Sequence, residues 1–507
     1  MDPITAHPFE ADASFDGGDL DCGNGLLLLI RQHMDPLPRG GLLEFRSTDI
    51  SVEADFPAWC RMTGNELVSW TKAGRLRSFL VCKGVLAERV PREPAPTRPS
   101  YTPSIRIVPV AIPPTLPAPA PAPAIPPLAA MGIGSWPRPR WMLQAIHDRI
   151  EGRLDDEEFQ STADDAVRLA VDAQLRSGVD VITDGEQRRD NYASFVGARL
   201  DNCQLIPLTD LLPLVDHPEE FAAQMQSLDV PASQVRHPAV FGPLGRSRPI
   251  AVHELDFVRT LTDRPVKIAL PGPYLLTRTM WMECISDQAY RSREHLAEDV
   301  VRVLREEVHF LLAAGAAIVQ LDEPVLSEVV MTGEKRQRTF MCGALSEKGD
   351  PRAELEFART LINQVVAGLP RERLALHVCR GNWTPDERVA LAGDYRPLLS
   401  FFGDLDVGAL FLELATPRAG EIEVLSELPR RLRIGVGVVN QKREPVESGD
   451  EVLRRTRRAV EVLGVERVLL TPDCGFATFA DNPVASARAA EAALGHVARA
   501  AAALRRG

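Results

Sequence analysis

Apolar runs rich in β-branched residues alternate with long amphipathic stretches over most of the chain after residue 130. Eight of these runs are predicted strands: 131–136, 179–186, 265–273, 316–324, 374–382, 408–414, 432–440 and 466–475. Helical periodicity fills most of the intervals, as in 292–315 and 448–464. Apolar strands separated by helices are typical of parallel sheets that are covered on both faces. The pattern predicts an α/β protein with a (β/α)8 TIM barrel over 131–507, in which the long interval 187–264 holds insertions.

A stretch crowded with proline and alanine precedes the predicted barrel. Closely spaced prolines exclude a continuous helix and favour the extended polyproline II conformation. The portion 109–127 alone would span roughly 60 Å at about 3.1 Å per residue. We therefore expect residues 89–130 to form a semi-rigid linker between the barrel and a smaller unit.

The smaller unit is predicted over 19–88, after an N-terminal segment, 1–18, that we expect to be flexible. Its hydrophobic pattern has the order β-α-β-α-β-β, which predicts a small α/β sandwich domain. Cys60, on the core face of the second helix, and Cys82, in an apolar strand, are predicted to be packing residues.

Composition and charge narrow the class of protein. The 507 residues are 45% hydrophobic and 25% charged, which is typical of globular proteins. The net charge of −12 argues against nucleic-acid partners and against binding to acidic lipid. No apolar run approaches the roughly 20 residues that span a bilayer, and the acidic N-terminus is unlike a signal peptide. The eight cysteines are scattered, so we expect reduced thiols in a cytoplasmic protein with no membrane partner.

Residues that can do chemistry follow nearly every predicted barrel strand. They are Ser135, Asp184, Glu186, Asp322, Glu323, His377, Cys379, Glu413, Asp473 and Cys474. A barrel of this type carries its active site at the carboxyl ends of its strands, where side chains from several strands meet. The sequence therefore predicts one composite site at that end of the barrel.

The stretch "LALHVCRGN" suggests a metal within this site. His377 and Cys379 are two residues apart on one strand and so face the same way. Imidazole and thiolate both bind zinc, and a catalytic zinc keeps one position for substrate. Glu413 and Cys474 would complete a ligand set of four. The ordinary alternative for a lone His-x-Cys pair is a buried thiol beside a hydrogen-bonded histidine.

Such a ligand set suggests a reaction type. Two thiolates and one carboxylate around Zn²⁺ leave a formal charge of about −1, which makes the centre a poor activator of water. The same centre can bind an incoming thiol and hold it as a nucleophilic thiolate. The donor set therefore predicts alkyl transfer to sulfur rather than hydrolysis.

Six separated motifs carry a resemblance to a known family: "GIGSWP", "TDGEQRR", "VQLDEP", "HVC", "FLEL" and "TPDCG". In this order they resemble the catalytic barrel of the cobalamin-independent methionine synthase family over 131–507. The resemblance implies zinc on His377, Cys379, Glu413 and Cys474, and a thiol such as homocysteine as the methyl acceptor. It also implies that the amino-acid end of this thiol is bound by Ile133, Ser135, Glu186 and Asp322, of which Glu186 and Asp322 serve as catalytic residues.

Departures from the family leave the second substrate open. Two-domain methionine synthases show an Asp-x-His-Ser-Pro-like segment where this chain has 438–448, with Asn440 or Gln441 in place of the histidine. The variants "HVCRGN" and "DGEQRR" resemble a single-barrel branch, which includes methyltransferases with other donors and enzymes that add thiols to epoxides. A methyl-folate donor is an analogy with the family. The segment 270–281 is expected to line the donor side, with Tyr274 and Trp281 either stacking on the donor or packing in the core.

The smaller unit resembles the TusA-like sulfur-carrier family in its element order, its "PLPRGG" turn and its "DFPAWCRMTGNELV" helix. In that family a Cys-Pro-x-Pro motif opens the first helix, and its cysteine carries a persulfide. Here the matching stretch is "CGNG", which keeps Cys22 and replaces both prolines by glycine. A helix N-terminus lowers the pKa of a thiol, which suits a carrier supplied by a sulfur-donor protein. The alternative is an unreactive cysteine in a domain kept for interaction or solubility.

Four functions compete at this point. The first is zinc-dependent methyl or alkyl transfer to a thiol, most simply homocysteine to methionine. The second is a sulfur-insertion or thiol-alkylating enzyme to which a Cys22 persulfide delivers sulfur. The third is a non-catalytic protein that binds an amino acid or a metal. The fourth is a metal-free decarboxylase, against which the two cysteines of the ligand set argue.

Overall fold

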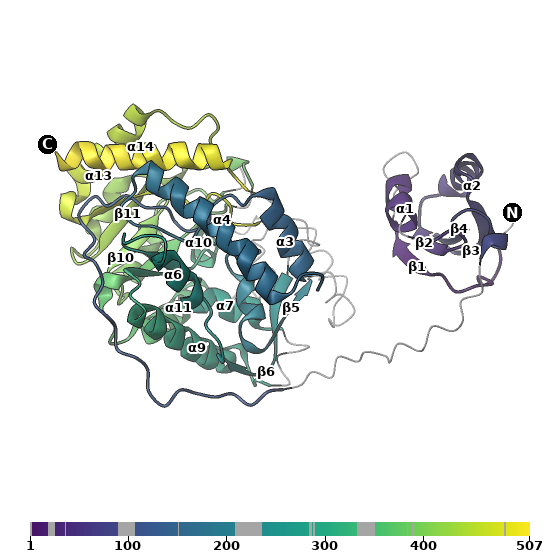
Figure 1. The fold of residues 1–507 in the computed structure, drawn as a ribbon, viewed down its shortest axis with the longest axis horizontal. Coiled ribbons are helices and arrows are strands. Elements are labelled where there is room, and N and C mark those ends of the chain that lie inside the picture. Colours follow the sequence, from purple (N-terminus) through teal and green to yellow (C-terminus); the bar gives the residue numbers. More distant parts are fainter. Residues whose placement is uncertain are drawn as a thin grey trace. The chain divides into compact units, whose positions relative to one another are not determined.

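The computed structural model describes residues 3–18, 26–35, 37–89, 107–150, 152–207, 236–282, 286, 289–331, 350–382, 384–387, 390–480 and 483–506. The chain divides into two compact units, Met1–Ser104 and Ile105–Gly507, and each is described by itself (Figure 1). Among the described residues, no helix combines the length and the apolar character needed to cross a bilayer.

A parallel sheet forms the centre of the larger unit. Its strands follow one another in the order of the sequence: β7 (Lys267–Pro271), β8 (Ile318–Asp322), β9 (Leu374–Val378), β10 (Ala409–Leu412), β11 (Arg433–Val439) and β12 (Val468–Pro472). Single parallel bridges join Ala130 to Leu470, Met131 to Val181 and Ile182 to Val266. The first two predicted runs thus close the ring between β12 and β7, and all eight runs take part in an α/β barrel.

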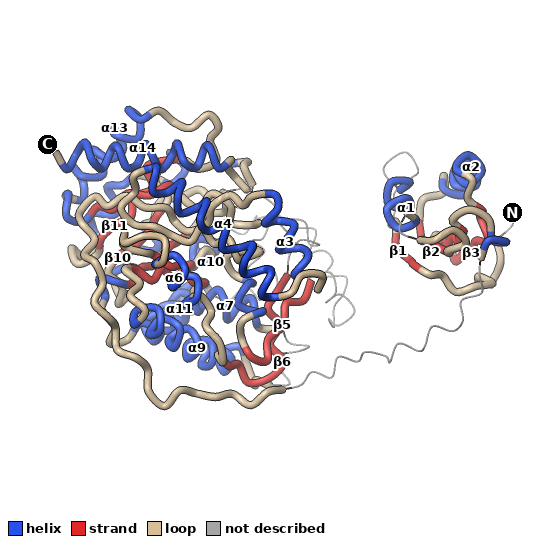
Figure 2. Tube along the Cα trace, viewed as in Figure 1, coloured by secondary structure: helices blue, strands red, loops and turns tan. Residues whose placement is uncertain are grey.

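Amphipathic helices surround this sheet (Figure 2). They are α3 (Arg140–Ile150), α4 (Asp156–Ser177), α6 (Val252–Arg259), α7 (Pro273–Met280), α9 (Arg293–Ala313), α10 (Val325–Met331), α11 (Pro351–Val366), α12 (Leu399–Gly403), α13 (Gly449–Leu463) and α14 (Ala487–Arg505). The helices predicted over 292–315 and 448–464 are α9 and α13. Both begin at a serine whose hydroxyl accepts a hydrogen bond from a backbone N–H three residues later.

Two apolar layers hold the barrel together. The outer layer lies between the strands and the helices and contains most of the buried aliphatic side chains. The inner layer fills the barrel, with Met131, Ile133, Val181 and Phe411 among its members. The long interval 187–264 contains the antiparallel pair β5 (Asp201–Pro207) and β6 (Arg236–Gly245) and helix α6, so it does hold insertions.

The described part of the predicted linker, from residue 107 onward, lies against the barrel instead of standing free (Figure 1). Ala120 donates its N–H to the carbonyl of Leu312, and Arg373 donates to the carbonyl of Ala120 at 2.5 Å. Arg433 binds the carbonyl of Ile125, whose side chain packs on the inner layer. An extended Pro/Ala chain leaves many carbonyls without intrachain donors, and the arginines of the barrel use them. We call residues 107–127 the strap.

The smaller unit has the predicted order β-α-β-α-β-β. Its elements are β1 (Ala13–Asp16), α1 (Leu26–Met34), β2 (Leu42–Ser47), α2 (Val52–Thr63), β3 (Glu66–Ala73) and β4 (Leu76–Cys82), in a sheet of order β1-β2-β4-β3. Strand β1 lies inside 1–18, the segment that we expected to be flexible, because Phe15 stacks on Phe45 of the core and the strand pairs with β2. Cys60 and Cys82 are buried. Cys22 lies outside the described residues.

Arg373 offers a test of how the strap is held. Its guanidinium donates to the carbonyls of Ala120, Leu312 and Ala316, and the side chain is buried. Arg373→Gln leaves buried acceptors without donors, so we expect the free energy of unfolding to fall by about 2 kcal/mol. Chemical denaturation measures this. The control is Arg371→Gln, which removes an exposed ion pair with Asp406 and should change stability by less than about 0.5 kcal/mol. Equal effects of the two variants would contradict the role assigned to Arg373.

Candidate metal and substrate site

The residues predicted at the strand ends gather at one end of the barrel and are all buried. Ile133 and Ser135 follow the first run, Glu186 follows the second, and Asp322 ends β8. A single cavity is lined by Ile133, Ser135, Glu186, Tyr192, Asp322, Pro324, His377, Cys379, Asn382, Cys474, Gly475 and Thr478. The predicted substrate-binding residues and three of the predicted metal ligands therefore share one cavity.

Three of the predicted metal ligands form a compact cluster. Cys379, Glu413 and Cys474 each place one ligand atom within 4.8 Å of the others. The two sulfur atoms are 3.5 Å apart, and Nε2 of His377 lies 3.9 Å from the sulfur of Cys474. Two ligands at about 2.3 Å from a tetrahedral zinc are about 3.8 Å from each other, so the spacing fits one ion. The donor set of two sulfurs, one nitrogen and one oxygen also fits zinc.

The Cys474 thiol of this cluster is not ionised by the protein alone. The hydrogen bond with Cys379, reinforced by burial, raises the pKa of Cys474 well above its ordinary value. Without a cation the Cys474 thiol therefore keeps its proton. A divalent ion would supply the positive charge that two adjacent thiolates need.

A chain of hydrogen bonds orients His377. Its Nδ1 lies 2.9 Å from Oδ1 of Asp322, which leaves Nε2 directed at the cluster. The same Asp322 oxygen accepts a hydrogen bond from Gln320, and Gln320 accepts one from Lys267, both at 2.7 Å. Histidines that bind metals commonly bond a carboxylate through their second nitrogen. Asp322, which we predicted for substrate, thus contacts a candidate metal ligand as well.

Sequence reasoning missed Lys267 and Gln320. Both are fully buried inside the barrel, and burial lowers the pKa of Lys267 to about 7. The ammonium lies 4.3 Å from the centre of the Phe411 ring. The available signal was a polar residue inside an apolar strand, in "PVKIALPGP" and in "AAIVQLDEP".

Glu413 and Asp473 differ in role. The two carboxylate oxygens of Glu413 accept hydrogen bonds from the backbone N–H of Arg380 at 2.8 Å and from the Arg418 side chain at 3.2 Å. Asp473 accepts two backbone N–H bonds, from Leu414 and Ala415, and burial raises its pKa to about 7. Asp473 therefore fastens the segment after β10 to the end of β12 and positions Glu413, while Glu413 faces the two sulfurs.

Glu186 occupies a strained and dry position. Its φ is 53°, in the left-handed region, and burial raises the pKa of its carboxyl to about 7. Oε1 lies 3.9 Å from Arg189, whereas Oε2 is buried without a hydrogen-bond partner among the described residues. A Cβ at Gly134 would come within 2.1 Å of Oε1, which explains the glycine before Ser135. A buried carboxylate oxygen without a partner is suited to a cationic ligand group.

The segment around Ser135 is tied to the loop after β12. The hydroxyl of Ser135 accepts the N–H of Ala477 at 3.2 Å, and its carbonyl accepts the N–H of Phe476. The N–H of Trp136 is already bonded to the carbonyl of Gly185. The backbone N–H of Trp136 is therefore engaged within the protein and is not available to a ligand.

Segment 438–448, which lacks the family's histidine, contacts Asn382 in the lining of the cavity. Gln441 donates to Asn382 at 2.5 Å, whereas the backbone N–H of Asn440 is bonded to Glu447. Lys442 follows, and its ammonium donates to the carbonyl of Gly381 at 2.8 Å. Burial lowers the pKa of Lys442. Gln441 thus acts on the cavity through a neighbour, and a lysine stands beside it.

The two aromatic residues that we considered for the donor side do not line this cavity. Tyr274 is fully buried, and its hydroxyl bonds Glu354 at 2.6 Å. Trp281 packs against the outer apolar layer. For both residues the structure agrees with the core alternative.

Comparisons with known proteins cover the larger unit. Residues 128–502 match the family model described as "Cobalamin-independent synthase, Catalytic domain". Methionine synthase of Saccharolobus solfataricus is 26% identical over 353 residues, which are 69% of this chain and 89% of that protein. Methionine synthase of Thermococcus kodakarensis is 27% identical over 352 residues, covering 69% of this chain and 87% of the relative.

Solved structures share the fold. A B12-independent methionine synthase from a Shewanella species, in complex with selenomethionine, has a TM-score of 0.57 at 21% identity and covers 75% of this chain and 98% of its own. A putative vitamin-B12 independent methionine synthase from Listeria monocytogenes has a TM-score of 0.53 at 20% identity, with coverage of 75% and 99%.

The raised pKa of Glu186 predicts that the free energy of unfolding depends on pH. Its pKa rises from 4.5 in the unfolded chain to about 7 in the folded protein, so the folded state binds the extra proton between these values. The stabilising contribution is present at low pH and is lost as the pH rises through about 7. Relative to Glu186→Gln, the wild type should therefore lose on the order of 2 kcal/mol between about pH 5 and about pH 8. Thermal unfolding at both pH values measures the difference, and the exposed Glu466→Gln is the control. A constant difference across this range would contradict the raised pKa.

Proposed function

Because this chain belongs to the cobalamin-independent synthase catalytic domain family, and is an enzyme of the cobalamin-independent methionine synthase type, we propose that it methylates the sulfur of homocysteine to form methionine. One observation carries the proposal. The ligand atoms of Cys379, Glu413 and Cys474 converge beside a cavity that two further carboxylates line. Family membership speaks against the non-catalytic and decarboxylase alternatives.

Zinc is the metal that this donor set fits, held by Cys379, Glu413 and Cys474 with His377 as the fourth ligand. When bound there, it would hold the sulfur of the substrate as a thiolate near neutral pH. The salt bridge of Glu413 with Arg418 and its bond to the N–H of Arg380 keep one carboxylate oxygen facing the sulfurs. Asp322 keeps His377 in the orientation that offers Nε2.

Glu186 and Asp322 are proposed to bind the ammonium group of the amino acid. Both carboxylates line the cavity, and the repulsion between them adds to burial in raising the pKa of Glu186. An ammonium group between them would relieve that repulsion and satisfy Oε2 of Glu186. We place the substrate carboxylate near Ile133 and Ser135. The substrate would then be fixed at its amino-acid end, with its sulfur directed at the cluster.

In the reaction the thiolate sulfur forms a bond to the methyl carbon, and the leaving atom of the donor keeps the electron pair. Orientation of both reactants is the main contribution of the protein, since a bound near-attack geometry removes much of the entropic barrier. The identity of the donor, including a methyl-folate, stays a prediction. Thiol addition to an epoxide is the second candidate, and it is favoured by Asn440 or Gln441 where two-domain relatives carry a histidine.

The sulfur-carrier role of the smaller unit also stays a prediction. The unit has the expected element order, and α1 begins at Leu26, shortly after Cys22. We propose that Cys22 accepts a persulfide from a sulfur-donor protein. The support for this is the sequence resemblance alone.

Cys474→Ser tests the proposed metal and the proposed reaction together. The variant removes one of two adjacent sulfur ligands, so we expect zinc to fall from about one ion per chain to well under half. Elemental analysis of the purified full chain measures this. Methionine formation from homocysteine, followed by mass spectrometry with a panel of methyl donors, should fall at least about a hundredfold.

The matched control is Cys203→Ser, which changes a cysteine of β5 outside the ligand cluster and should keep both zinc and turnover. Full activity of Cys474→Ser would contradict the proposed reaction. Turnover by wild-type protein that contains no zinc would contradict the proposed metal. It would not bear on the fold.

Cys22→Ser tests the carrier role. Incubation of the full chain with polysulfide should add one sulfur atom to the wild type, seen by intact-mass spectrometry, and add none to the variant. Cys82→Ser is the control, because Cys82 is fully buried and burial raises its pKa, which disfavours the reactive thiolate. Sulfur loading that survives in Cys22→Ser would refute the role of Cys22.

A further inference from the structure

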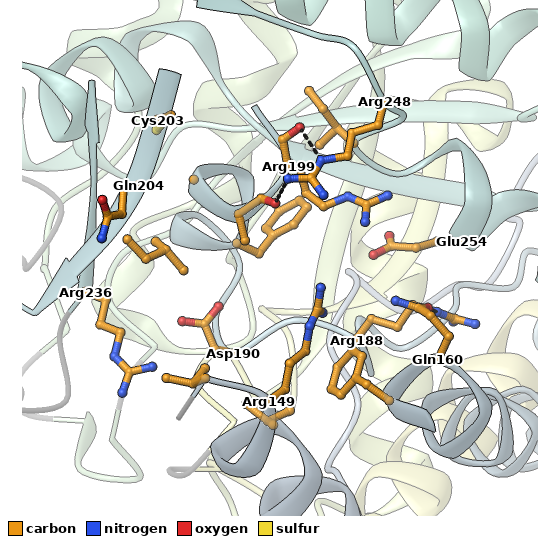
Figure 3. A pocket seen from close by; sticks show the side chains of 18 of the residues that line it. Arg149, Gln160, Arg188, Asp190, Arg199, Cys203, Gln204, Arg236, Arg248 and Glu254 are labelled. Carbon is orange, nitrogen blue, oxygen red and sulfur yellow. Dashed lines mark hydrogen bonds between the residues drawn. The ribbon is translucent and has the colours of Figure 1, made fainter. Parts of the chain in front are cut away.

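A second cavity, of about 520 Å³, lies between the start of the barrel helices and the inserted strands (Figure 3). Its walls come from α3, α4, the segment 188–199, β5, β6 and α6. It shares no lining residue with the cavity beside the metal cluster. Its volume is in the range of sites that bind small organic molecules.

Positive charge dominates the lining of this cavity. Five arginines take part, Arg149, Arg188, Arg199, Arg236 and Arg248, against two carboxylates, Asp190 and Glu254. Figure 3 shows Arg149, Arg199 and Arg236 around the open centre, with Asp190 among them. Five arginines around one cavity contrast with the net charge of −12 of the whole chain. A cavity of this kind attracts anions, because its low-dielectric walls concentrate the field.

Part of this charge is not neutralised by the protein. Arg149 forms an ion pair with Asp156 at 2.8 Å and Arg188 forms one with Asp164, and both of these acids lie outside the cavity lining. Glu254 is engaged by Arg189, which lies outside the cavity lining, at 2.5 Å. Arg199 and Arg248 donate to backbone carbonyls and form no ion pair with the residues that the structure describes. The guanidinium of Arg236 forms neither a hydrogen bond nor an ion pair with any described residue. Burial raises the pKa of Asp190, and the charge of Arg236 acts in the opposite direction.

Arg188 is a buried residue of the cavity lining. Its side chain is 5% exposed and is held by Gln160 at 2.9 Å and by a short contact with Asp164. Its Nη1 is buried and has no hydrogen-bond partner in the described part of the chain. Buried guanidinium nitrogens normally find an acceptor. A missing acceptor at this position therefore points to a ligand.

The neighbouring histidine shows the same surplus of positive charge. Burial lowers the pKa of His253 to about 3, and the charges of Arg199, Arg188 and Arg189 lower it further in the same direction. His253 stays neutral and lies 3.2 Å from Arg199. It adds a polar contact without adding charge.

The remaining lining is apolar. Phe159, Phe195, Leu205 and Ile250 contribute carbon surface to the cavity. Arg149 lies over the ring of Phe159 at 4.3 Å, which keeps its guanidinium at the border between the apolar and the charged regions. The cavity therefore offers one charged region and one apolar region.

We propose that this cavity binds a small organic anion, with a phosphate or a pair of carboxylates against Arg188, Arg199 and Arg236 and an apolar body against Phe159 and Ile250. Arginine suits both kinds of anion because its planar group donates two parallel hydrogen bonds. The site goes beyond the proposed methyl transfer. It lies next to the proposed substrate site, since Arg188 follows Glu186 by two residues and Arg189 lies between Glu186 of the first cavity and Glu254 of the second.

Calorimetric titration of the full chain tests the site with two probes, phenyl phosphate and benzene-1,3-dicarboxylate. We expect saturable binding of at least one probe, and the probe that binds identifies the anion class. Arg236→Gln should weaken binding by about tenfold, as expected for the loss of one charge-assisted contact, and Arg149→Gln, which removes one positive charge from the lining, should weaken it as well. Raising the ionic strength from about 0.05 M to about 0.5 M should weaken it as well.

Two controls separate this site from other causes. Arg454→Gln changes an exposed arginine on α13 that is paired with Glu451, and it should leave the dissociation constant within about twofold. Cys474→Ser should bind the probes like the wild type, which separates this cavity from the metal cluster. Absence of saturable binding for both probes, or equal binding by Arg236→Gln, Arg149→Gln and the wild type, would overturn the proposal.

Discussion

Burial of carboxylates at the ends of the barrel strands is the constraint that shapes this site. An ionised carboxylate away from water is strongly destabilising unless fixed donors or a cation hold it. Glu323 is held by the backbone N–H groups of Tyr274 and Leu275 at the start of α7, and Asp473 by those of Leu414 and Ala415. Glu323 is structural because each of its two oxygens accepts a backbone N–H group. Glu186 and Asp473 each keep one buried oxygen, Oε2 and Oδ2, without a partner among the described residues, and of these two only Glu186 lines the cavity.

Close packing around the strand ends explains three of the glycines found there. A Cβ at Gly272 would come within 2.2 Å of the Glu323 carboxylate, and one at Gly437 within 2.0 Å of Asp473. One at Gly475 would meet the hydroxyl of Ser135 at 2.2 Å. In each case the backbone of one strand end approaches the side chain of another. The motif residues Glu323, Asp473 and Ser135 are therefore also positions at which neighbouring strand ends pack closely against each other.

Arginine serves three different purposes in the larger unit. Arg373 and Arg433 bind carbonyls of the strap and fasten it to the barrel. Arg189 neutralises Glu254 inside the protein. The arginines of the second cavity face an open space and have fewer acidic partners than charges. An arginine is therefore structural where the chain itself supplies a hydrogen-bond acceptor. Where the chain supplies none, the arginine is available to bind a ligand.

Much of the barrel and of the metal cluster could be predicted from the sequence. Strand runs, helical periodicity and the residues at strand ends are local patterns, and parallel closure brings the carboxyl ends of the strands to one face. The same patterns predicted Ser135 and Glu186 at one site with His377 and Cys379, and the family resemblance added Ile133; all five line one cavity. Periodicity could not reveal that the Pro/Ala segment binds the barrel, because its acceptors are backbone carbonyls that carry no side-chain signal.

Contacts between distant segments decided the remaining features. The bonds from Lys267 through Gln320 and Asp322 to His377 join three strands, and no local pattern contains them. The second cavity combines Arg149, Arg188 and Arg236 from elements far apart in the chain. The sequence by itself determined which residues could bind a metal or an anion. Only the tertiary structure decided which of them meet, because strand closure and burial set the distances and determine which charges the protein leaves without a partner.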